Sequence, residues 1–222
     1  MNSHRSVVMI SLALSLSSCA LFSKGEVNFP RYFSPDLPKA TSKVGSKRSG
    51  VELRLGRVSA GSYIGEKIVF RESDYEVGFY DFLMWTEKPE AYLRRALTRV
   101  LFEEEGLTSV LSGAGPTLDV ELVSFEEVKT PVHLGLVRIA FTLHDDRVVH
   151  MQQTMAIERP IVMVVAKDKQ ADAVAEALGE ALRSAVYEVS GRVLADLARV
   201  TSTAPRPCSD AATPAAKGSA AP

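Results

Sequence analysis

The sequence has no excess of charge of either sign. Its 222 residues include 26 Lys and Arg against 27 Asp and Glu, for a formal net charge of −1. A protein that binds nucleic acid would present a strongly basic face, and this balance argues against that class of partner. Residues 39–48 are the one dense basic segment, but they also hold Ser, Thr and Gly, which favours a solvated loop.

The sequence has few residues of the types that form catalytic or metal-binding sites. The chain has two Cys and four His, and no His pairs with Cys or Glu at zinc-site spacing. No Ser lies in a nucleophile-elbow motif, and the segment from Gly61 to Lys67 lacks the spacing of a phosphate-binding loop. The run His144-Asp145-Asp146 fits a hairpin turn better than a metal site. We therefore predict a protein that is not an enzyme and has no metal or cofactor.

The N-terminal apolar run is too short to cross a bilayer. Residues 7–16 are apolar except for two serines, whereas a membrane-spanning helix needs about 20 apolar residues. His4 and Arg5 precede the run, and small residues follow it. This arrangement is typical of a secretory signal peptide.

The end of that run resembles the lipobox of bacterial lipoproteins, with Leu16, Ser17, Ser18 and Cys19 in the four positions. The resemblance implies cleavage before Cys19 and covalent acylation of Cys19, by palmitate among other chains, as the only attached group. Ala20 stands where an Asp would retain a lipoprotein at the inner membrane, so the resemblance implies the outer membrane, facing the periplasm. Acylation of Cys19 leaves Cys208 without an intrachain disulfide partner. The alternative is an ordinary signal peptide with a chance Cys.

Composition divides the chain into four parts. We predict a signal peptide over residues 1–18, a tether over 19–26 and a single domain over 27–200, with a flexible connection at 35–50. Residues 201–222 are Thr, Ala, Pro, Ser and Gly with few large apolar side chains. Such a segment cannot offset its ordering entropy by burial, which predicts a disordered tail.

Alternating apolar residues predict strands near residues 51–56, 67–72, 75–80, 118–125, 137–143 and 149–157, and residues 27–33, interrupted by Pro30, are a candidate first strand. Helical spacing predicts one helix after Trp85, with Thr86 as N-cap and Gly106 as its stop, and a second over about residues 170–199. A phase change near Val123 and Phe125 suggests a β-bulge. We assign the α+β class, with a mainly antiparallel sheet of about five to six strands and two helices packed on one face.

The last helix has a continuous apolar stripe with two interpretations. The stripe can cover the sheet, or it can form a self-associating coiled coil, and we favour the first because the sheet needs a cover. Gly179 and Gly191 interrupt the helix at a cost of about 1 kcal/mol each. We expect both to permit a close backbone approach to the sheet.

Three segments resemble the ABC-type transport auxiliary lipoproteins, the PqiC-like family. They are the strand residues 53–58, the pair of extended segments over 63–71 and 75–80, and Trp85 before a helix with Leu93 and Leu97. The sequence departs from the family at Gly61-Ser62, where an apolar-Pro step is usual, and in its long tail.

The family resemblance implies a non-catalytic role. Members accompany an ABC ATPase, a permease and an MCE-domain protein that move lipids or other apolar molecules across the envelope, and the lipoprotein is thought to dock the periplasmic assembly at the outer membrane. Alternatives are a structural envelope lipoprotein that oligomerises through the terminal helix and a lipoprotein that binds a small ligand between sheet and helices.

Tyr63, Arg71 and Trp85 are the candidate partner-binding residues. Tyr63 and Arg71 would form a polar contact point. The competing interpretation pairs Arg71 with a nearby carboxylate and places Tyr63 and Trp85 in the core under the first helix, and we favour it.

Overall fold

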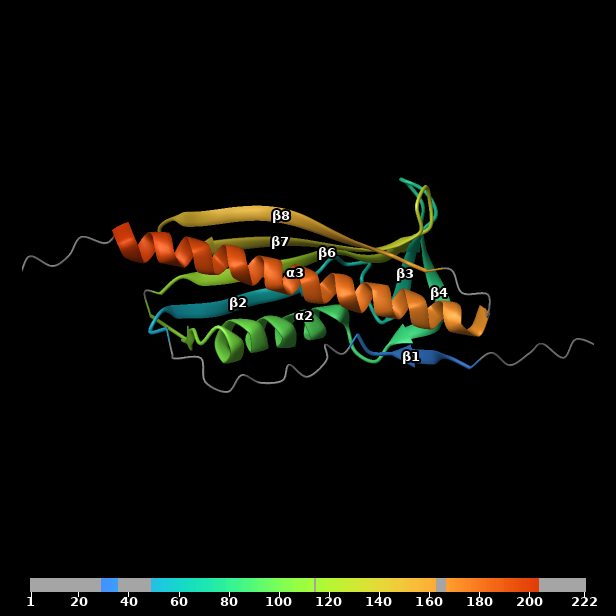
Figure 1. Ribbon diagram of the computed structural model, residues 1–222, viewed down its shortest axis with the longest axis horizontal. Helices are drawn as coiled ribbons and strands as arrows, with labels where there is room; N and C mark the ends of the chain where they lie inside the picture. Colours follow the sequence, from blue (N-terminus) through green and yellow to red (C-terminus); the bar gives the residue numbers. More distant parts are fainter. Residues whose placement is uncertain (1–28, 36–48, 114, 163–166, 204–222) are drawn as a thin grey trace, which may run out of the picture.

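The computed structural model describes residues 29–35, 49–113, 115–162 and 167–203. It contains one sheet of eight strands and one layer of helices (Figure 1). The strands are β1 (Arg31–Phe33), β2 (Glu52–Ala60), β3 (Lys67–Arg71), β4 (Val77–Trp85), β5 (Thr108–Ser109), β6 (Thr117–Val128), β7 (Leu134–His144) and β8 (Val149–Pro160). The helices are α2 (Pro89–Thr98), which continues as the π-helical segment η1 (Arg99–Glu104), and α3 (Lys167–Thr203).

The predicted mainly antiparallel sheet of five to six strands is wrong, because the sheet is mixed and has eight strands. β6, β7 and β8 are antiparallel neighbours, as are β3 and β4. However, β2 and β3 both run parallel to β6, β1 runs parallel to β4, and β5 runs parallel to β2. The helix over α2 and η1 carries the chain back across the sheet, and such a long crossover produces parallel neighbours. β5 has two residues, too short for a periodic pattern to reveal, whereas β1 lies within the strand predicted near residues 27–33.

β6 is the central strand and changes neighbour along its length. Its first half pairs with β2 up to Leu122, and its last residues pair with β3 from Glu126 onward. The register with β7 shifts between Leu122 and Ser124. The predicted bulge near Val123 is therefore present, and it returns Phe125 to the core side of the strand.

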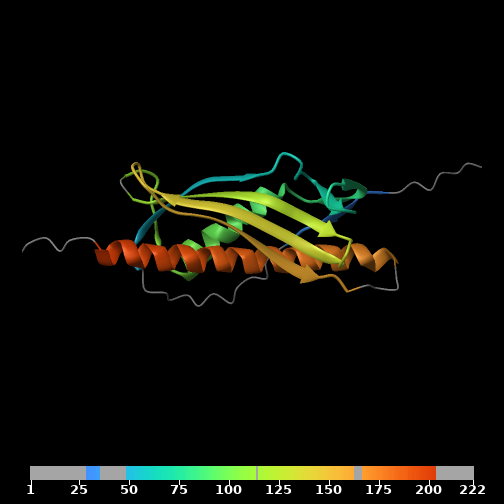
Figure 2. The ribbon, with the colours of Figure 1, turned by 90° about the horizontal axis from the view of Figure 1, so that it is seen from above.

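Both helices lie on the same side of the sheet (Figures 1 and 2). The apolar stripe of α3 is buried within the chain, mainly over β7 and β8. Its members are Val174, Leu178, Leu182, Val186, Val189, Val193 and Leu197. Because this stripe is already covered, it is not available for a coiled coil between copies. α3 also continues to Thr203, past the predicted start of the tail at residue 201.

Two local predictions about the helices need correction. Thr86 does not cap the first helix, since the N-cap is Lys88; instead its hydroxyl shares a 2.6 Å hydrogen bond with the Tyr92 hydroxyl. Gly179 lies against Pro35 and Gly191 faces open space, so neither supports a close approach to the sheet. That approach occurs at Gly135 of β7, where a Cβ would lie 3.3 Å from the backbone of Ala177. Gly106 does end the helical stretch, with a left-handed φ of 72°.

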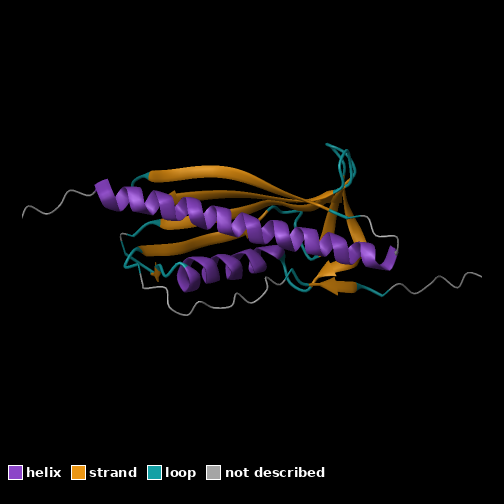
Figure 3. Ribbon diagram, in the orientation of Figure 1, coloured by secondary structure: helices purple, strands orange, loops and turns teal. Residues whose placement is uncertain are grey.

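Apolar side chains fill the space between the sheet and the helices. Trp85, Phe125 and Phe141 are the largest of them, and each is at most 2% exposed. The core extends from Leu53 of β2 to Leu197 near the end of α3. The opposite face of the sheet carries no helix of the described ranges, and this uncovered face holds the candidate site (Figure 3).

Candidate functional site

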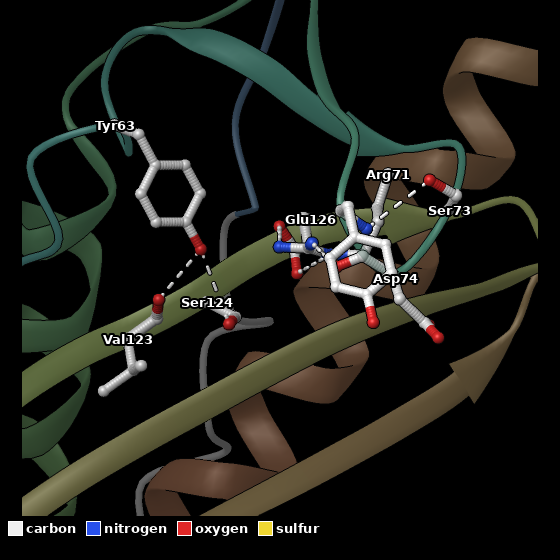
Figure 4. Close-up of polar contacts among 8 residues, drawn as sticks. Tyr63, Arg71, Ser73, Asp74, Val123, Ser124 and Glu126 are labelled. Atoms are coloured by element: carbon white, nitrogen blue, oxygen red, sulfur yellow. Dashed lines mark hydrogen bonds and ion pairs between the residues drawn. The ribbon is translucent and has the colours of Figure 1, made fainter.

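The connection between β2 and β3 places Tyr63 against the middle of β6. Its hydroxyl donates a 2.9 Å hydrogen bond to the carbonyl oxygen of Val123 and lies 3.5 Å from the Ser124 hydroxyl (Figure 4). Val123 is the bulge residue, so its backbone is skipped in the register with β7. The Tyr63 hydroxyl therefore supplies a hydrogen bond where the sheet ladder is interrupted.

Arg71, the last residue of β3, makes a two-pronged ion pair with Glu126 of β6. Arg71 Nε lies 2.9 Å from Glu126 Oε1, and Nη2 lies 3.2 Å from Oε2. Nη1 also donates to the carbonyl oxygen of Asp74 at 3.2 Å, which ties the strand to the β3–β4 turn (Figure 4). The hydrogen bond to Glu126 raises the pKa of Arg71 above its usual value, against the opposing effect of burial. Glu126 is only 1% exposed, so the Arg71 guanidinium offsets the desolvation cost of burying its carboxylate.

Trp85 reaches the same stretch of β6 from the helix side of the sheet. It is 2% exposed, and its ring lies 4.9 Å from the Phe125 ring at an interplanar angle of 39°. A buried ring offers no surface to a partner, so Trp85 acts by fixing the position of β6. The structure thus brings all three candidate residues to residues 123–126 of β6, and the contacts of Arg71 and Trp85 match the competing interpretation.

A groove of about 510 Å³ lies beside the Arg71–Glu126 pair on the uncovered face. Its apolar lining comes from Val128, Pro131, Val132, Leu134 and Leu136. Its charged lining comes from Arg71, Asp74, Glu126, Arg138 and Glu158, with Thr130 completing the wall. The groove therefore combines apolar contact area with charges of both signs, a lining suited to a segment of protein.

Two loops project together at one end of this groove, and we call them the paired tip: residues 72–76 of the β3–β4 turn and residues 129–133 of the β6–β7 turn (Figure 1). Lys129 Nζ lies 2.6 Å from a Glu72 carboxylate oxygen and 3.7 Å from the centre of the Phe70 ring. The Thr130 hydroxyl donates to the Glu72 carbonyl oxygen. The paired tip exposes Tyr75, at 98%, and Val132, at 59%.

Glu127 forms a second buried acidic site, on the helix side of β6. The Tyr80 hydroxyl donates to its carboxylate at 2.6 Å, and His133 Nε2 lies 2.5 Å from its other oxygen. Burial, and next the bond to Glu127, raises the pKa of Tyr80. Sequence reasoning missed both glutamates, because two adjacent charged residues after an apolar pattern normally mark the end of a buried strand. Two adjacent carboxylates inside a long strand pattern were the available signal.

The described residues contain no cluster of three or more His, Cys, Asp or Glu arranged to hold a metal ion. His144 instead hydrogen-bonds the Asp145 carbonyl oxygen at 3.1 Å and Asp119 at 3.2 Å. Asp145 Oδ1 accepts from the backbone N–H of Arg147 and of Val148, which organises the β7–β8 hairpin turn. Cys19 and Cys208 lie outside the described residues. Across the described ranges, every helix lacks the combined length and hydrophobicity of a membrane-spanning segment.

No protein-family model matches the chain, and neither does the sequence of any curated protein. Solved structures, however, share its fold. A Xanthomonas campestris protein of family DUF330 superposes with a TM-score of 0.65 at 19% identity, covering 78% of this chain and 99% of that one. An uncharacterised protein gives 0.53 at 14% identity, covering 72% and 99%. A hypothetical protein from Chlamydia trachomatis gives 0.50 at 9% identity, covering 68% and 99%. DUF330 is the PqiC-like family, so the fold agrees with the resemblance in the sequence; at these identities the likeness establishes the fold alone.

Proposed function

We propose that the protein is a lipid-anchored, non-catalytic component of an ABC transport system of the MCE type. In this role Cys19 holds the domain at the outer membrane, facing the periplasm, and the domain docks the periplasmic assembly that moves lipid or another apolar solute. The lipobox, the family resemblance and the fold shared with the DUF330 protein support the proposal.

The groove beside Arg71 and Glu126 is the observation that carries the docking role. It lies on the sheet face without a helix, it has an apolar floor between charges, and the paired tip projects beside it. In this arrangement Arg71 and Val132 contact the partner, whereas Tyr63 and Trp85 hold β6 in place from opposite sides of the sheet. The partner is the MCE-domain protein, with the permease and ATPase recruited through it.

The two alternative functions have less support from the described residues. An oligomer built through the apolar stripe of α3 would have to expose side chains that now pack against β7 and β8. A small ligand between sheet and helices would have to displace closely packed core side chains.

Site-specific photo-crosslinking in cells of the source organism tests the docking role. A photoreactive amino acid at Val132 should give a crosslink that mass spectrometry identifies as the MCE-domain protein. The matched control is Val149, which is 56% exposed against 59% for Val132 but lies at the β7–β8 hairpin, at the other end of β7. Equal crosslinking from both positions, or a product with no MCE-domain or ABC component, would contradict the proposal.

A further inference from the structure

Four aromatic side chains are exposed along one margin of the sheet. Phe29 and Tyr32 are 78% and 63% exposed, and Phe79 and Phe82 of β4 are 45% and 44% exposed. We call these residues the aromatic margin. Aromatic side chains are normally buried in protein cores. Several exposed ones on neighbouring segments therefore indicate an interaction surface.

The pairing of β1 with β4 explains how this surface forms. β1 is the outer strand of the sheet, and its Tyr32 pairs with Met84. The flanking residues point to the helix side, since Arg31 Nη2 lies 2.8 Å from Asp172 of α3 and Phe33 packs against the core. Because successive side chains of a strand alternate, Tyr32 points away from the helices.

The chain itself keeps this margin near the membrane. Phe29 is the tenth residue after Cys19, and ten extended residues span at most about 35 Å. β1, which begins two residues after Phe29, is therefore the sheet strand held closest to a lipid anchor at Cys19.

Two cations beside the margin are paired within the described part of the chain. Arg31 pairs with Asp172, and Lys67 Nζ lies 3.1 Å from Asp81 Oδ1. At β1 and β4, aromatic rings are therefore the main feature that the described residues would present to a bilayer. Tyr favours the headgroup region, where its ring meets apolar chains and its hydroxyl stays hydrated, and Phe places its apolar ring at the boundary of headgroups and acyl chains.

From these observations we infer that the aromatic margin is a membrane-contact surface, whose rings enter the headgroup region of the bilayer that anchors Cys19. This inference rests on the lipid anchor of the proposed function. Its occupant is the phospholipid surface itself, and the contact needs no anionic lipid because it is made by aromatic rings, while Arg31 and Lys67 beside them are paired.

The contact would also orient the docking groove. β4 has nine residues, and at about 3.3 Å per residue its two ends lie about 25–30 Å apart. Phe29, Tyr32 and Phe82 of the margin lie toward the end of β4 beside β1, Phe79 lies farther along β4, and the paired tip lies beyond the opposite end (Figure 1). A sheet seated on the bilayer at β1 and the adjoining end of β4 would tilt the paired tip and its groove away from the bilayer, where a partner can reach them.

Tryptophan fluorescence in proteoliposomes tests this surface. The full-length acylated protein is reconstituted in phosphatidylcholine vesicles that carry nitroxide-labelled lipid, as the Tyr32→Trp and Tyr75→Trp variants. Both keep the same buried background from Trp85, the one native tryptophan. The added Trp at position 32 should be quenched at least about twofold more than the one at position 75, as expected for a ring in the headgroup region. Quenching should persist in about 1 M NaCl, where electrostatic attraction is screened beyond about 3 Å.

Equal quenching at positions 32 and 75 would overturn the inference, and so would a signal that needs anionic lipid or disappears in high salt. Phe82→Trp is the second variant, and circular dichroism checks that each variant is folded. The outcome is independent of the docking role, because crosslinking at Val132 reports on the partner and quenching at position 32 on the lipid. Absence of acylation on mass spectrometry would identify failure of the anchor itself.

Discussion

The Tyr63 hydroxyl donates a hydrogen bond to the Val123 carbonyl oxygen. Val123 lies between the part of β6 that pairs with β2 and the part that pairs with β3. This carbonyl belongs to the bulge residue, so the side chain takes the place of a missing sheet hydrogen bond. The candidate site is thus built on an interruption of the central strand, which Tyr63 stabilises from the β2–β3 connection.

Tyr63→Phe should lower the free energy of unfolding by about 1–2 kcal/mol, because it leaves a partly buried carbonyl without its donor. Urea titration followed by circular dichroism measures the change. The control is Tyr75→Phe, whose 98% exposed side chain should change stability by less than about 0.5 kcal/mol. Equal stabilities for the two variants would show that the Val123 bond contributes nothing.

Arg71→Met should destabilise the protein by about 3 kcal/mol, since it leaves the buried Glu126 carboxylate unpaired. The double variant with Glu126→Leu should recover most of that loss, because removing both charges removes the desolvation penalty. Arg95→Met, at an ion pair with Glu87 whose side chains are about half exposed, should change stability far less than Arg71→Met, because water screens an exposed pair. A double variant as unstable as Arg71→Met would contradict this account.

His144 should make stability depend on pH. Its pKa is raised above 6.5, first by the hydrogen bond to the Asp145 carbonyl and next by the bond to Asp119. A group whose pKa is higher in the folded state stabilises the protein while it is protonated. The contribution is therefore present below the unfolded pKa of about 6.5 and is lost as pH rises through the higher folded pKa.

NMR titration of the His144 ring should give a folded-state pKa above 6.5 in the wild type and a lower one in Asp119→Asn. The difference in unfolding free energy between wild type and His144→Gln should shrink as pH rises from 6 to 8, by the linkage above. If the difference in unfolding free energy between the two proteins does not change with pH, protonation of His144 does not contribute to stability.

Gly135→Ala should destabilise the protein by about 1–2 kcal/mol, because its Cβ would meet the backbone of α3 at 3.3 Å. Gly191→Ala should instead stabilise it by about 0.5–1 kcal/mol, since this helical position has no neighbour within 4 Å and Ala is the better helix former. Thermal unfolding of both variants measures the two opposite shifts. A stabilising Gly135→Ala would show that α3 can move away from β7.

Several elements follow from local pattern. The alternation in β2, β6 and β7 identified strands, and the helical spacing identified α2 and α3 together with the Gly106 stop. The phase change at Val123 identified the bulge. These features depend on residues close in sequence, which is why periodicity reveals them.

Other features depend on residues far apart in sequence. The sequence indicated that Arg71 would pair with a carboxylate, but the partner, Glu126, lies 55 residues away on a parallel strand. β2 and β3 are parallel neighbours of β6 because α2 carries the chain back across the sheet. The residue pattern of a single strand does not show which strands will be its neighbours.

The sequence by itself determined the predicted export signal, the Cys19 lipobox, the nearly balanced charge and most strands and helices, because each depends on composition or short-range spacing. Only the tertiary structure decided the mixed eight-stranded sheet, the burial of Trp85 and Glu126, the groove beside Arg71 and the aromatic margin at β1 and β4. Strand order and side-chain burial are set by long-range packing, in which a strand as short as the two-residue β5 can extend a sheet without any signal in the sequence.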